Sequence, residues 1–401
     1  MTFKTHAPKS LPDTLDPRTR LIHGGPERSG FDETCEPIYM TSGYVYGAAE
    51  EAEAAFANDG WRYVYSRFRN PTVSVFEQRI ADYEGAKLVW ATGSGMAAVH
   101  AAILSQVRAG DRIVAPYAMF GSCLWIIKDL CPRYGVEVDL VNGTELEEWK
   151  AALSKPAKVV FLESPTNPML EVIDIQAVAD LAHAAGARLV VDNVFATPVL
   201  QKPFDLGADV VVYSATKHID GQGRCLGGVI LANDDSFLDD VGPFLRHTGP
   251  ALSPFNAWLL AKGLETLELR VKAQTQTALE VARFLEGHPK VARALYAGLE
   301  SHPQYELARR QMKGGSNLLA FQIKGGKEDA FRVLNALKLI PISNNLGDSK
   351  SLITHPATTT HQKLTDAEKA RVGITQATLR LSVGLEAAAD LIRDLDQALN
   401  A

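Results

Sequence analysis

The sequence predicts an α/β protein in which a large domain, built on a mostly parallel sheet of seven strands, is followed by a smaller C-terminal α+β domain. Seven short apolar runs rich in Val, Ile and Leu alternate with helical patterns between about residues 62 and 256. Within these runs consecutive positions are apolar, as is typical of strands buried on both faces. The chain has 401 residues, which is enough for two hydrophobic cores.

The helical patterns between the runs carry start and stop residues. In one of them Asp174 can cap the N-terminus, Ile175, Val178 and Leu181 fall on one face, and Gly186 can close the C-terminus. Alternating strands and helices indicate right-handed crossovers between parallel strands. The expected strands are Lys87–Ala91, Arg112–Ala115, Val136–Val141, Lys158–Glu163, Arg188–Asp192, Asp209–Tyr213 and Val229–Ala232.

The pattern changes after Pro254, where a helical stretch from Ala257 to Glu286 is followed by apolar runs among further helices. The apolar runs are Leu318–Ile323, Leu339–Ser343 and Thr378–Val383, and a smaller α+β domain fits this pattern best. The predicted organisation is an N-terminal arm over residues 1–61, a large domain over 62–256 and a C-terminal domain over 257–401.

Composition excludes several classes of function. The net charge is −6 with both signs mixed, so no basic stripe is available for nucleic acid. No apolar run approaches the roughly 20 residues of a membrane span, and the segment Met1 to Asp16 is polar and lacks the apolar core of a signal peptide. We expect a cytoplasmic protein without a metal site, whose four cysteines are scattered reduced thiols: Cys35, Cys123, Cys131 and Cys225.

A glycine-rich turn, Gly93 to Ala98, follows the first expected strand and opens a helix. It matches the dinucleotide fingerprint GxGxxG/A, so a dehydrogenase must be considered. That fold also needs an acidic residue at the end of the next strand, whereas Asp111 precedes the strand. What the turn still offers is backbone N–H groups at a helix N-terminus, which suit a phosphate, although a purely structural turn is equally compatible with the sequence.

Two further residues stand at strand ends. Lys217 follows the strand that ends at Tyr213, where ligands bind in open α/β sheets and where a desolvated amine can form Schiff bases. Asp192 ends the strand before it, and a carboxylate there needs a partner such as the ring nitrogen of pyridoxal 5′-phosphate (PLP). A phosphate turn, a lysine and an aspartate on one sheet edge are what PLP requires.

Six ordered motifs between about Thr19 and Leu399 resemble the Cys/Met-metabolism family of PLP enzymes, which have fold type I. The motifs are Tyr65-Ser66-Arg67 with Asn70-Pro71-Thr72, Ser94-Gly95-Met96, Glu163-Ser164-Pro165-Thr166-Asn167-Pro168, Val191-Asp192-Asn193, Tyr213-Ser214-Ala215-Thr216-Lys217-His218 and Leu379-Arg380-Leu381-Ser382-Val383-Gly384-Leu385-Glu386. The resemblance implies a PLP-dependent transferase with no metal.

Several site roles are implied by the resemblance. Lys217 would carry the cofactor and act as the catalytic base, and Asp192 would pair with the ring nitrogen. The phosphate would be held by the backbone of Gly95 and Met96, by the hydroxyls of Ser214 and Thr216, and by Tyr65 and Arg67 of a neighbouring subunit in a homotetramer built as a dimer of dimers. Asn167 would bind the ring hydroxyl, Phe120 would stack on the ring, and Arg380, with Asn345 and Tyr117, would contact the substrate.

Departures from the family pattern narrow the expected reaction. Phe120 stands where most relatives have a tyrosine, so the ring is kept but the phenol is lost. In the relatives that phenol assists proton transfer or departure of the leaving group. Here Tyr65, Lys217 or the nearby Tyr117 would have to do so. Ser122 stands where methionine γ-lyases have a reactive cysteine, and Asn345 replaces a serine. With the segment His355–His361, these features favour γ-replacement of O-succinyl-L-homoserine by sulfide, giving L-homocysteine and succinate. Cysteine as nucleophile, an acetyl ester and, less favoured, a γ-lyase reaction remain alternatives.

Overall fold

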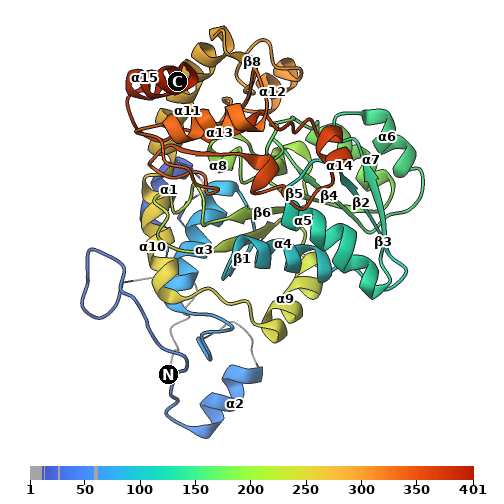
Figure 1. The fold of residues 1–401 in the computed structure, drawn as a ribbon. Coiled ribbons are helices and arrows are strands. Elements are labelled where there is room, and N and C mark those ends of the chain that lie inside the picture. The colour runs from blue at the N-terminus through green and yellow to red at the C-terminus, as the bar shows by residue number, and fades with distance from the viewer. Residues whose placement is uncertain (1–10, 13, 26–27, 58–61) are drawn as a thin grey trace.

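The computed structural model of the protein describes residues 11–12, 14–25, 28–57 and 62–401. A large α/β domain lies at the centre, a smaller domain containing the C-terminus lies above it, and the N-terminal segment extends away at the opposite end (Figure 1). Residues 1–10, 13, 26–27 and 58–61 of the predicted arm lie outside the described residues. The seven-stranded α/β class with a second, smaller domain is confirmed.

The large sheet has the strand order β1-β7-β6-β5-β4-β2-β3. Strand β7 runs antiparallel to both of its neighbours, and the other adjacent pairs are parallel. All seven predicted strands are present, with ends shifted by at most one residue. Their bounds are β1 (Leu88–Thr92), β2 (Arg112–Pro116), β3 (Glu137–Val141), β4 (Val159–Glu163), β5 (Arg188–Asp192), β6 (Val210–Ser214) and β7 (Gly228–Ala232).

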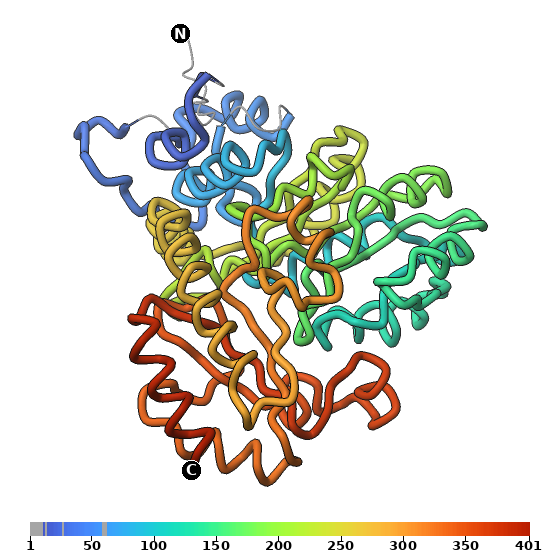
Figure 2. Tube along the Cα trace, turned by 90° about the horizontal axis from the view of Figure 1, so that it is seen from above, coloured from blue at the N-terminus to red at the C-terminus, as the bar shows by residue number. Residues whose placement is uncertain are grey.

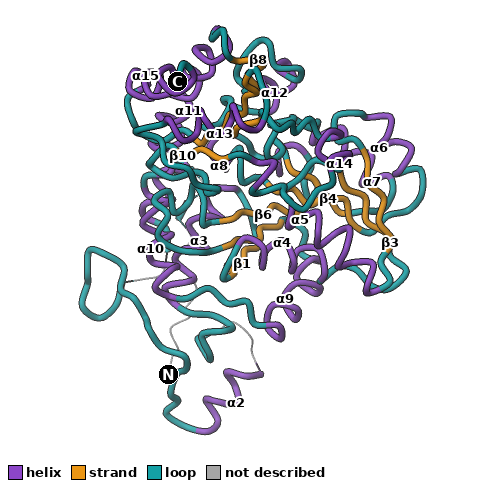
Figure 3. The backbone as a smooth tube through the Cα atoms, viewed as in Figure 1, coloured by secondary structure: helices purple, strands orange, loops and turns teal. Residues whose placement is uncertain are grey.

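Two layers of helices cover the sheet, because side chains alternate between its faces. Val190 packs into one core and Val191 into the other. Figure 3 shows the strands enclosed between these layers. One layer contains α1 (Pro17–His23), α3 (Pro71–Glu84), α6 (Leu146–Ala152), α7 (Ile175–Ala184), α8 (Thr197–Leu200) and α10 (Pro254–Glu265). The other contains α4 (Gly95–Leu104), α5 (Gly121–Trp125), η1 (Ile126–Leu130), η2 (Cys131–Tyr134) and α9 (Ser236–Thr248).

The edge strand β3 corrects one expectation. It was predicted to be apolar on both faces, but Glu137 and Asp139 are exposed, because β3 lies at the edge of the sheet and only β2 flanks it. The predicted helix Asp174–Gly186 is confirmed as α7, with Asp174 accepting from the backbone N–H of Ala177.

The C-terminal domain contains a four-stranded antiparallel sheet of order β10-β11-β9-β8. Its strands are β8 (Val291–Leu295), β9 (Leu318–Ile323), β10 (Leu352–Thr354) and β11 (Thr378–Ser382). The helices packed on it are α11 (Leu267–Gly287), α13 (Lys327–Ala336) and α15 (Ala388–Leu399). Shorter elements are η3 (Pro203–Leu206), α12 (Tyr305–Gln311), η4 (Pro356–Thr358) and α14 (Asp366–Arg371).

The structure adds three details to the pattern of this half of the chain. The helical stretch Ala257–Glu286 is two helices, separated at Thr266. Leu339–Ser343 is not a strand and pairs through a single bridge between Ile342 and Ile353. Strands β8 and β10 were missed, because β8 has exposed residues at its centre and β10 has three residues.

The predicted domain boundary at residue 256 stays a prediction. Leu260 and Leu264 of α10 lie in the core of the large sheet, whereas Val281 of α11 lies in the core of the C-terminal domain. Seen from above, the N-terminal segment and the C-terminal helix lie on separate sides of the molecule (Figure 2). Among the described residues no helix is both long and apolar enough to cross a membrane.

The N-terminal segment containing α2 (Ala49–Ala57) exposes several large apolar side chains. Phe31 is 93% and Val45 90% exposed. A single chain gives these side chains little to pack against, and apolar groups clustered on one exposed segment are typical of an association surface.

Candidate active site

The carboxyl ends of three neighbouring parallel strands bring the principal candidates together. Glu163 of β4 and Asp192 of β5 are paired in register at the last position of each strand. Lys217 follows β6, which pairs in parallel with β5. Loops that follow β4 and β5 pack into the core of the C-terminal domain through Leu170 and Phe195. This edge of the large sheet therefore faces the smaller domain.

Lys217 is held within this edge. Its Nζ donates a hydrogen bond of 2.6 Å to Oδ1 of Asn345, which comes from the C-terminal domain. Burial, with the nearby positive charge of Arg380, lowers the pKa of Lys217 to about 8. About a tenth of this amine is therefore neutral and nucleophilic at pH 7, far more than for an exposed lysine.

Asp192 has the opposite perturbation. Its side chain belongs to a residue that is 8% exposed, and Oδ1 accepts a hydrogen bond of 3.1 Å from the backbone N–H of Val194. Burial raises the pKa of Asp192 to about 7. A cationic N–H placed beside this carboxylate would stabilise its charged form, so the site suits a protonated ring nitrogen.

The start of α4 and the end of β6 are in unusually close contact. A Cβ atom added to Gly95 would lie 2.5 Å from Cβ of Ser214, so only glycine fits this position without a shift. Ser94 caps the helix by accepting from the N–H of Ala97. The first-turn N–H groups of Gly95 and Met96 thus lie beside the hydroxyl-bearing residue Ser214, an arrangement suited to a phosphate.

The Thr216 hydroxyl lies in the same loop as Lys217 but already has backbone partners. It accepts from the N–H of Gly227 at 3.1 Å and lies 3.3 Å from the Gly227 carbonyl oxygen. Its predicted phosphate contact must therefore coexist with this bond to the start of β7.

Arg380 of β11 is almost completely buried, at 2% exposure. Its Nη1 donates to Oδ1 of Asn167 and its Nη2 to the carbonyl oxygen of Asn344, both at 2.9 Å. Its Nε is buried and has no hydrogen-bond partner among the described residues. Burial lowers the pKa of Arg380 to about 10, because the charged guanidinium has lost the stabilisation that water provides. A substrate carboxylate bound beside it would stabilise the charged form.

Phe120 and Tyr117 both follow β2 but have different neighbours. Phe120 is the N-cap residue of α5, and its backbone N–H donates to Oε2 of Glu163 at 3.0 Å. The ring of Tyr117 lies 4.5 Å below the guanidinium of Arg371. Tyr117 and Arg371 line a cavity of about 310 Å³ together with Glu171. The structure thus places Phe120 beside the strand-end carboxylates and Tyr117 beside α14.

Tyr65 and Arg67 lie in the N-terminal part of the chain, outside this group of contacts. Tyr65 is 42% exposed and forms an isolated bridge with Gly43. Arg67 is exposed, donates to the carbonyl oxygen of Arg246 and lies over the ring of Phe68. No contact between these two side chains and Lys217 is present within the described chain.

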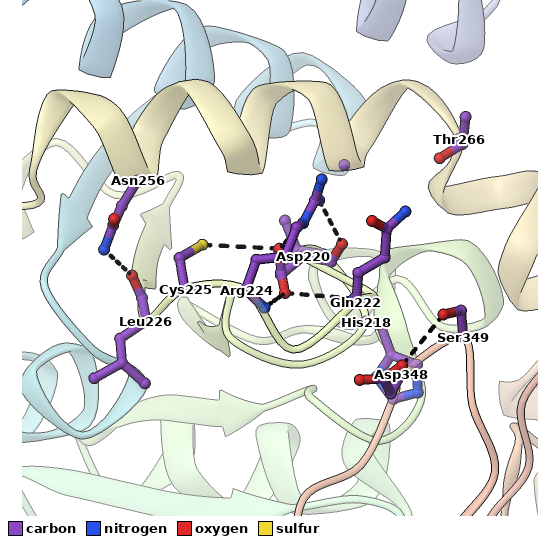
Figure 4. A network of polar contacts seen from close by, with 12 residues as sticks. His218, Asp220, Gln222, Arg224, Cys225, Leu226, Asn256, Thr266, Asp348 and Ser349 are labelled. Carbon is purple, nitrogen blue, oxygen red and sulfur yellow. Dashed lines mark hydrogen bonds and ion pairs between the residues drawn. The ribbon is translucent and has the colours of Figure 1, made fainter.

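The loop after Lys217 is fixed by the buried carboxylate of Asp220 (Figure 4). Asp220 accepts two hydrogen bonds from Arg224, one from its backbone N–H at 2.7 Å and one from its side-chain Nε at 2.9 Å. The nearby Cys225 has a pKa raised to about 12, chiefly by burial, so it is a poor nucleophile. The described ranges contain no group of three or more His, Cys, Asp or Glu side chains suited to a metal ion.

Sequence reasoning assigned no role to two residues that the fold brings to this edge. Glu163 is 3% exposed and contacts the loop of Phe120. His361 is 3% exposed, its Nε2 has no hydrogen-bond partner among the described residues, and burial lowers its pKa to about 4. Glu163 is the first residue of the family motif that continues to Pro168, and it is the last residue of β4. Its position at a strand end is the signal that could have identified it.

The fold and the site define a class: an α/β enzyme with a desolvated lysine, a buried carboxylate and a glycine turn at a helix N-terminus, all at one edge of the sheet. Residues 18–400 match the model of the Cys/Met metabolism PLP-dependent enzyme family, and the chain belongs to that family. Its cofactor is therefore PLP.

Curated relatives and solved structures agree with this assignment. The chain is 53% identical over 397 residues to an O-succinylhomoserine sulfhydrylase from Mycobacterium tuberculosis, covering 98% of each chain. It is 46% identical to an O-succinylhomoserine sulfhydrylase from Pseudomonas aeruginosa, covering 96% of this chain and 95% of the relative. A structure from Campylobacter jejuni, described as an O-acetylhomoserine (thiol)-lyase with N'-pyridoxyl-lysine-5'-monophosphate, has a TM-score of 0.92 at 33% identity and covers 96% and 100% of the two chains.

Proposed function

We propose that this enzyme catalyses the PLP-dependent γ-replacement of O-succinyl-L-homoserine by sulfide, giving L-homocysteine and succinate. The observation that carries the proposal is the similarity, over nearly the whole chain, to two O-succinylhomoserine sulfhydrylases at 53% and 46% identity. In the net reaction the bond from Cγ to the ester oxygen breaks, a bond from Cγ to sulfur forms, and succinate leaves.

The residues present suit PLP. Lys217 is proposed to bind its aldehyde, and Asp192 to pair with the protonated ring nitrogen. The close contact of Gly95 with Ser214 places the N–H groups at the start of α4 beside the Ser214 hydroxyl, and these groups are proposed to hold the phosphate together with the N–H of Met96 and the hydroxyl of Thr216. Phe120 is proposed to stack on the ring, and Asn167 to hydrogen-bond its hydroxyl oxygen. When bound, PLP supplies an electron sink for the α- and β-carbons of the amino acid.

Arg380 is proposed to bind the α-carboxylate of the substrate, because its Nε is buried with no partner in the described part of the chain and a carboxylate can accept from it. Asn345 connects this position to the lysine, since its Oδ1 accepts from Lys217 while its carbonyl oxygen lies 3.4 Å from Nη2 of Arg380. The turn that contains Asn345 would thus hold the Lys217 amine and the Arg380 guanidinium in fixed positions relative to each other. Tyr117 is proposed to contribute from its place at the end of β2.

Lys217 is proposed to move protons once the substrate amine has replaced its own. Its pKa of about 8 lets the free amine take a proton from Cα and later return one, without a strong base in the site. Phe120 lacks a hydroxyl, so a phenol that assists at the leaving group would have to come from elsewhere.

Tyr65 of a neighbouring subunit is our candidate for that phenol, and Arg67 for a further phosphate contact. Both side chains are exposed on the chain itself, where they lie in a segment with many exposed apolar residues. This supports an oligomer with shared active sites, and we propose a homotetramer made of two dimers.

A turnover assay tests the reaction. Purified protein loaded with PLP is given O-succinyl- or O-acetyl-L-homoserine with either sulfide or cysteine, and L-methionine alone serves as the γ-elimination control. We expect the highest kcat/KM for the succinyl ester with sulfide. A clear preference for cysteine with that ester would contradict the proposed function and identify a cystathionine-forming enzyme.

A further inference from the structure

Glu163, the last residue of β4, is a buried carboxylate to which the proposed reaction assigns no task. It lies between β2 and β5 in the sheet order, so its side chain can contact the loops on both sides of its own strand. Burial raises its pKa well above the ordinary value, and the nearby Asp192 raises it further. A carboxylate kept at such a position needs compensating hydrogen bonds.

Those bonds come from two separate loops. Oε2 of Glu163 accepts the backbone N–H of Phe120 at 3.0 Å, and Oε1 accepts the backbone N–H of Asn167. Both partners are donors, so both positions of the Glu163 side chain must be acceptors. The two oxygens of a carboxyl group satisfy this requirement, whereas an amide presents one acceptor and one donor.

The two loops carry the residues that would hold opposite parts of the cofactor and substrate. Phe120 provides the proposed stacking ring, and Asn167 accepts from Nη1 of Arg380 through its side chain. The position of Glu163 opposite Asp192 is fixed by the register of β4 and β5. Glu163 thus connects the loop after β2 and the loop after β4 to the strand end that carries Asp192. Through Asn167 it is also connected to Arg380.

The contacts of Glu163 point to a structural anchor, because both of its oxygens are occupied by backbone N–H groups of the two loops. Burial and the charge of Asp192 keep the pKa of Glu163 well above its ordinary value, although the two backbone N–H groups and the Arg380 cation act in the opposite direction. Cys123 lies close enough to both carboxylates for their charges to raise the pKa of its thiol further, so it is no competing nucleophile.

We propose that Glu163 is a positioning residue that holds Phe120 and Asn167 at fixed places relative to Asp192, and so sets the orientation of the bound cofactor. The inference rests on the proposed cofactor contacts of these three residues, and not on which ester or thiol is the substrate. It predicts that loss of one acceptor on residue 163 changes the geometry and affinity of bound PLP.

The test compares Glu163→Gln with Asp394→Asn as a matched control. Asp394 is also a buried carboxylate that accepts backbone N–H groups, from Lys338, Leu339 and Ile340, but it lies on α15 in the C-terminal domain. Apoenzyme of each variant is titrated with PLP, and the visible circular dichroism of the bound cofactor is recorded. Unfolding in denaturant is measured in parallel.

We expect Glu163→Gln to bind PLP at least about tenfold more weakly than wild type and to show an altered visible dichroic band, because one of the two acceptors becomes a donor and leaves a buried backbone N–H without its partner. Asp394→Asn should lose stability yet keep the wild-type affinity and dichroic band. Wild-type affinity and dichroism in Glu163→Gln would overturn the inference.

A second variant covers the case in which Glu163→Gln fails to fold. Glu163→Asp keeps the charge but is one methylene shorter, so it cannot reach both loops, and we expect weaker PLP binding than in wild type. Wild-type binding by this variant would equally refute the positioning role. If wild-type protein itself formed no lysine-linked chromophore with PLP, the proposed function would fail instead, so the two failures are distinguishable.

Discussion

Gly95→Ala perturbs the contact between the start of α4 and the end of β6. The added Cβ would lie 2.5 Å from Cβ and 2.8 Å from Cα of Ser214, where ordinary van der Waals contact begins at 3.4 Å. The nearest atoms are backbone or next to it, so one of the two elements must move by almost 1 Å. Overpacking of this kind costs about 1–3 kcal/mol, and the better helix propensity of alanine offsets up to about 1 kcal/mol of it.

The same displacement would move the N–H groups of Gly95 and Met96 away from a bound phosphate. Hydrogen bonds to a charged group contribute about 1.5–3 kcal/mol each, so weakening one of them should lower PLP affinity roughly tenfold to a hundredfold. The assays are denaturant unfolding of the apoenzyme and fluorescence titration with PLP.

Gly287→Ala is the matched control, because Gly287 is also helical and an added Cβ meets nothing within 4 Å. This variant should be neutral or more stable by up to about 1 kcal/mol, with unchanged PLP affinity. The reasoning is refuted if Gly95→Ala equals Gly287→Ala in both stability and affinity, since the contact with Ser214 would then be soft or the phosphate would bind elsewhere.

Four further predictions test the proposed site. Lys217→Ala should abolish both the visible absorbance band of the PLP-bound enzyme and borohydride labelling of the peptide that contains this residue. Arg380→Lys should raise KM for the homoserine ester at least about tenfold with a smaller effect on kcat, as steady-state kinetics would show, because a planar fork is replaced by a point charge. The pKa of Asp192 is about 7 in the folded state and 3.8 ordinarily, so the unfolded apoenzyme loses this proton at lower pH than the folded one. The stability of the apoenzyme should therefore fall as the pH rises from about 4 to about 7. Asp192→Asn should reduce that fall in apoenzyme unfolding curves; an unchanged pH dependence would argue against the raised pKa. Finally, mixed oligomers of Arg67→Ala and Lys217→Ala chains, refolded together, should regain up to about a quarter of wild-type activity if active sites are shared, and none if each chain is self-sufficient.

The candidate site could be predicted largely from strand ends. Lys217 and Asp192 stood out because each follows a buried apolar run, and ligands bind at that edge of an open α/β sheet. The structure places these two residues on adjacent strands, with Asn345 bonded to the lysine. Glu163 occupies an equivalent strand end, yet local sequence cannot show that its acceptors meet the N–H groups of Phe120 and Asn167.

The C-terminal domain was less predictable, because strand signals there are weak. Leu339–Ser343 is apolar enough to predict a strand, but it follows α13 without pairing beyond one bridge. Strand β10 has three residues and is stabilised by pairing with β11, a long-range contact that propensity does not contain.

By itself the sequence determined the alternation of strands and helices, the parallel sheet and the strand ends on which Lys217 and Asp192 stand, because periodicity and burial are local properties of the chain. The tertiary structure decided which side chains meet: Asn345 at Lys217, Asn167 at Arg380, and the carboxylates of Glu163 and Asp192 side by side. The shifted pKa values of Lys217 and Asp192 depend on this packing, because the side chains become buried and gain charged neighbours only when distant segments have come together.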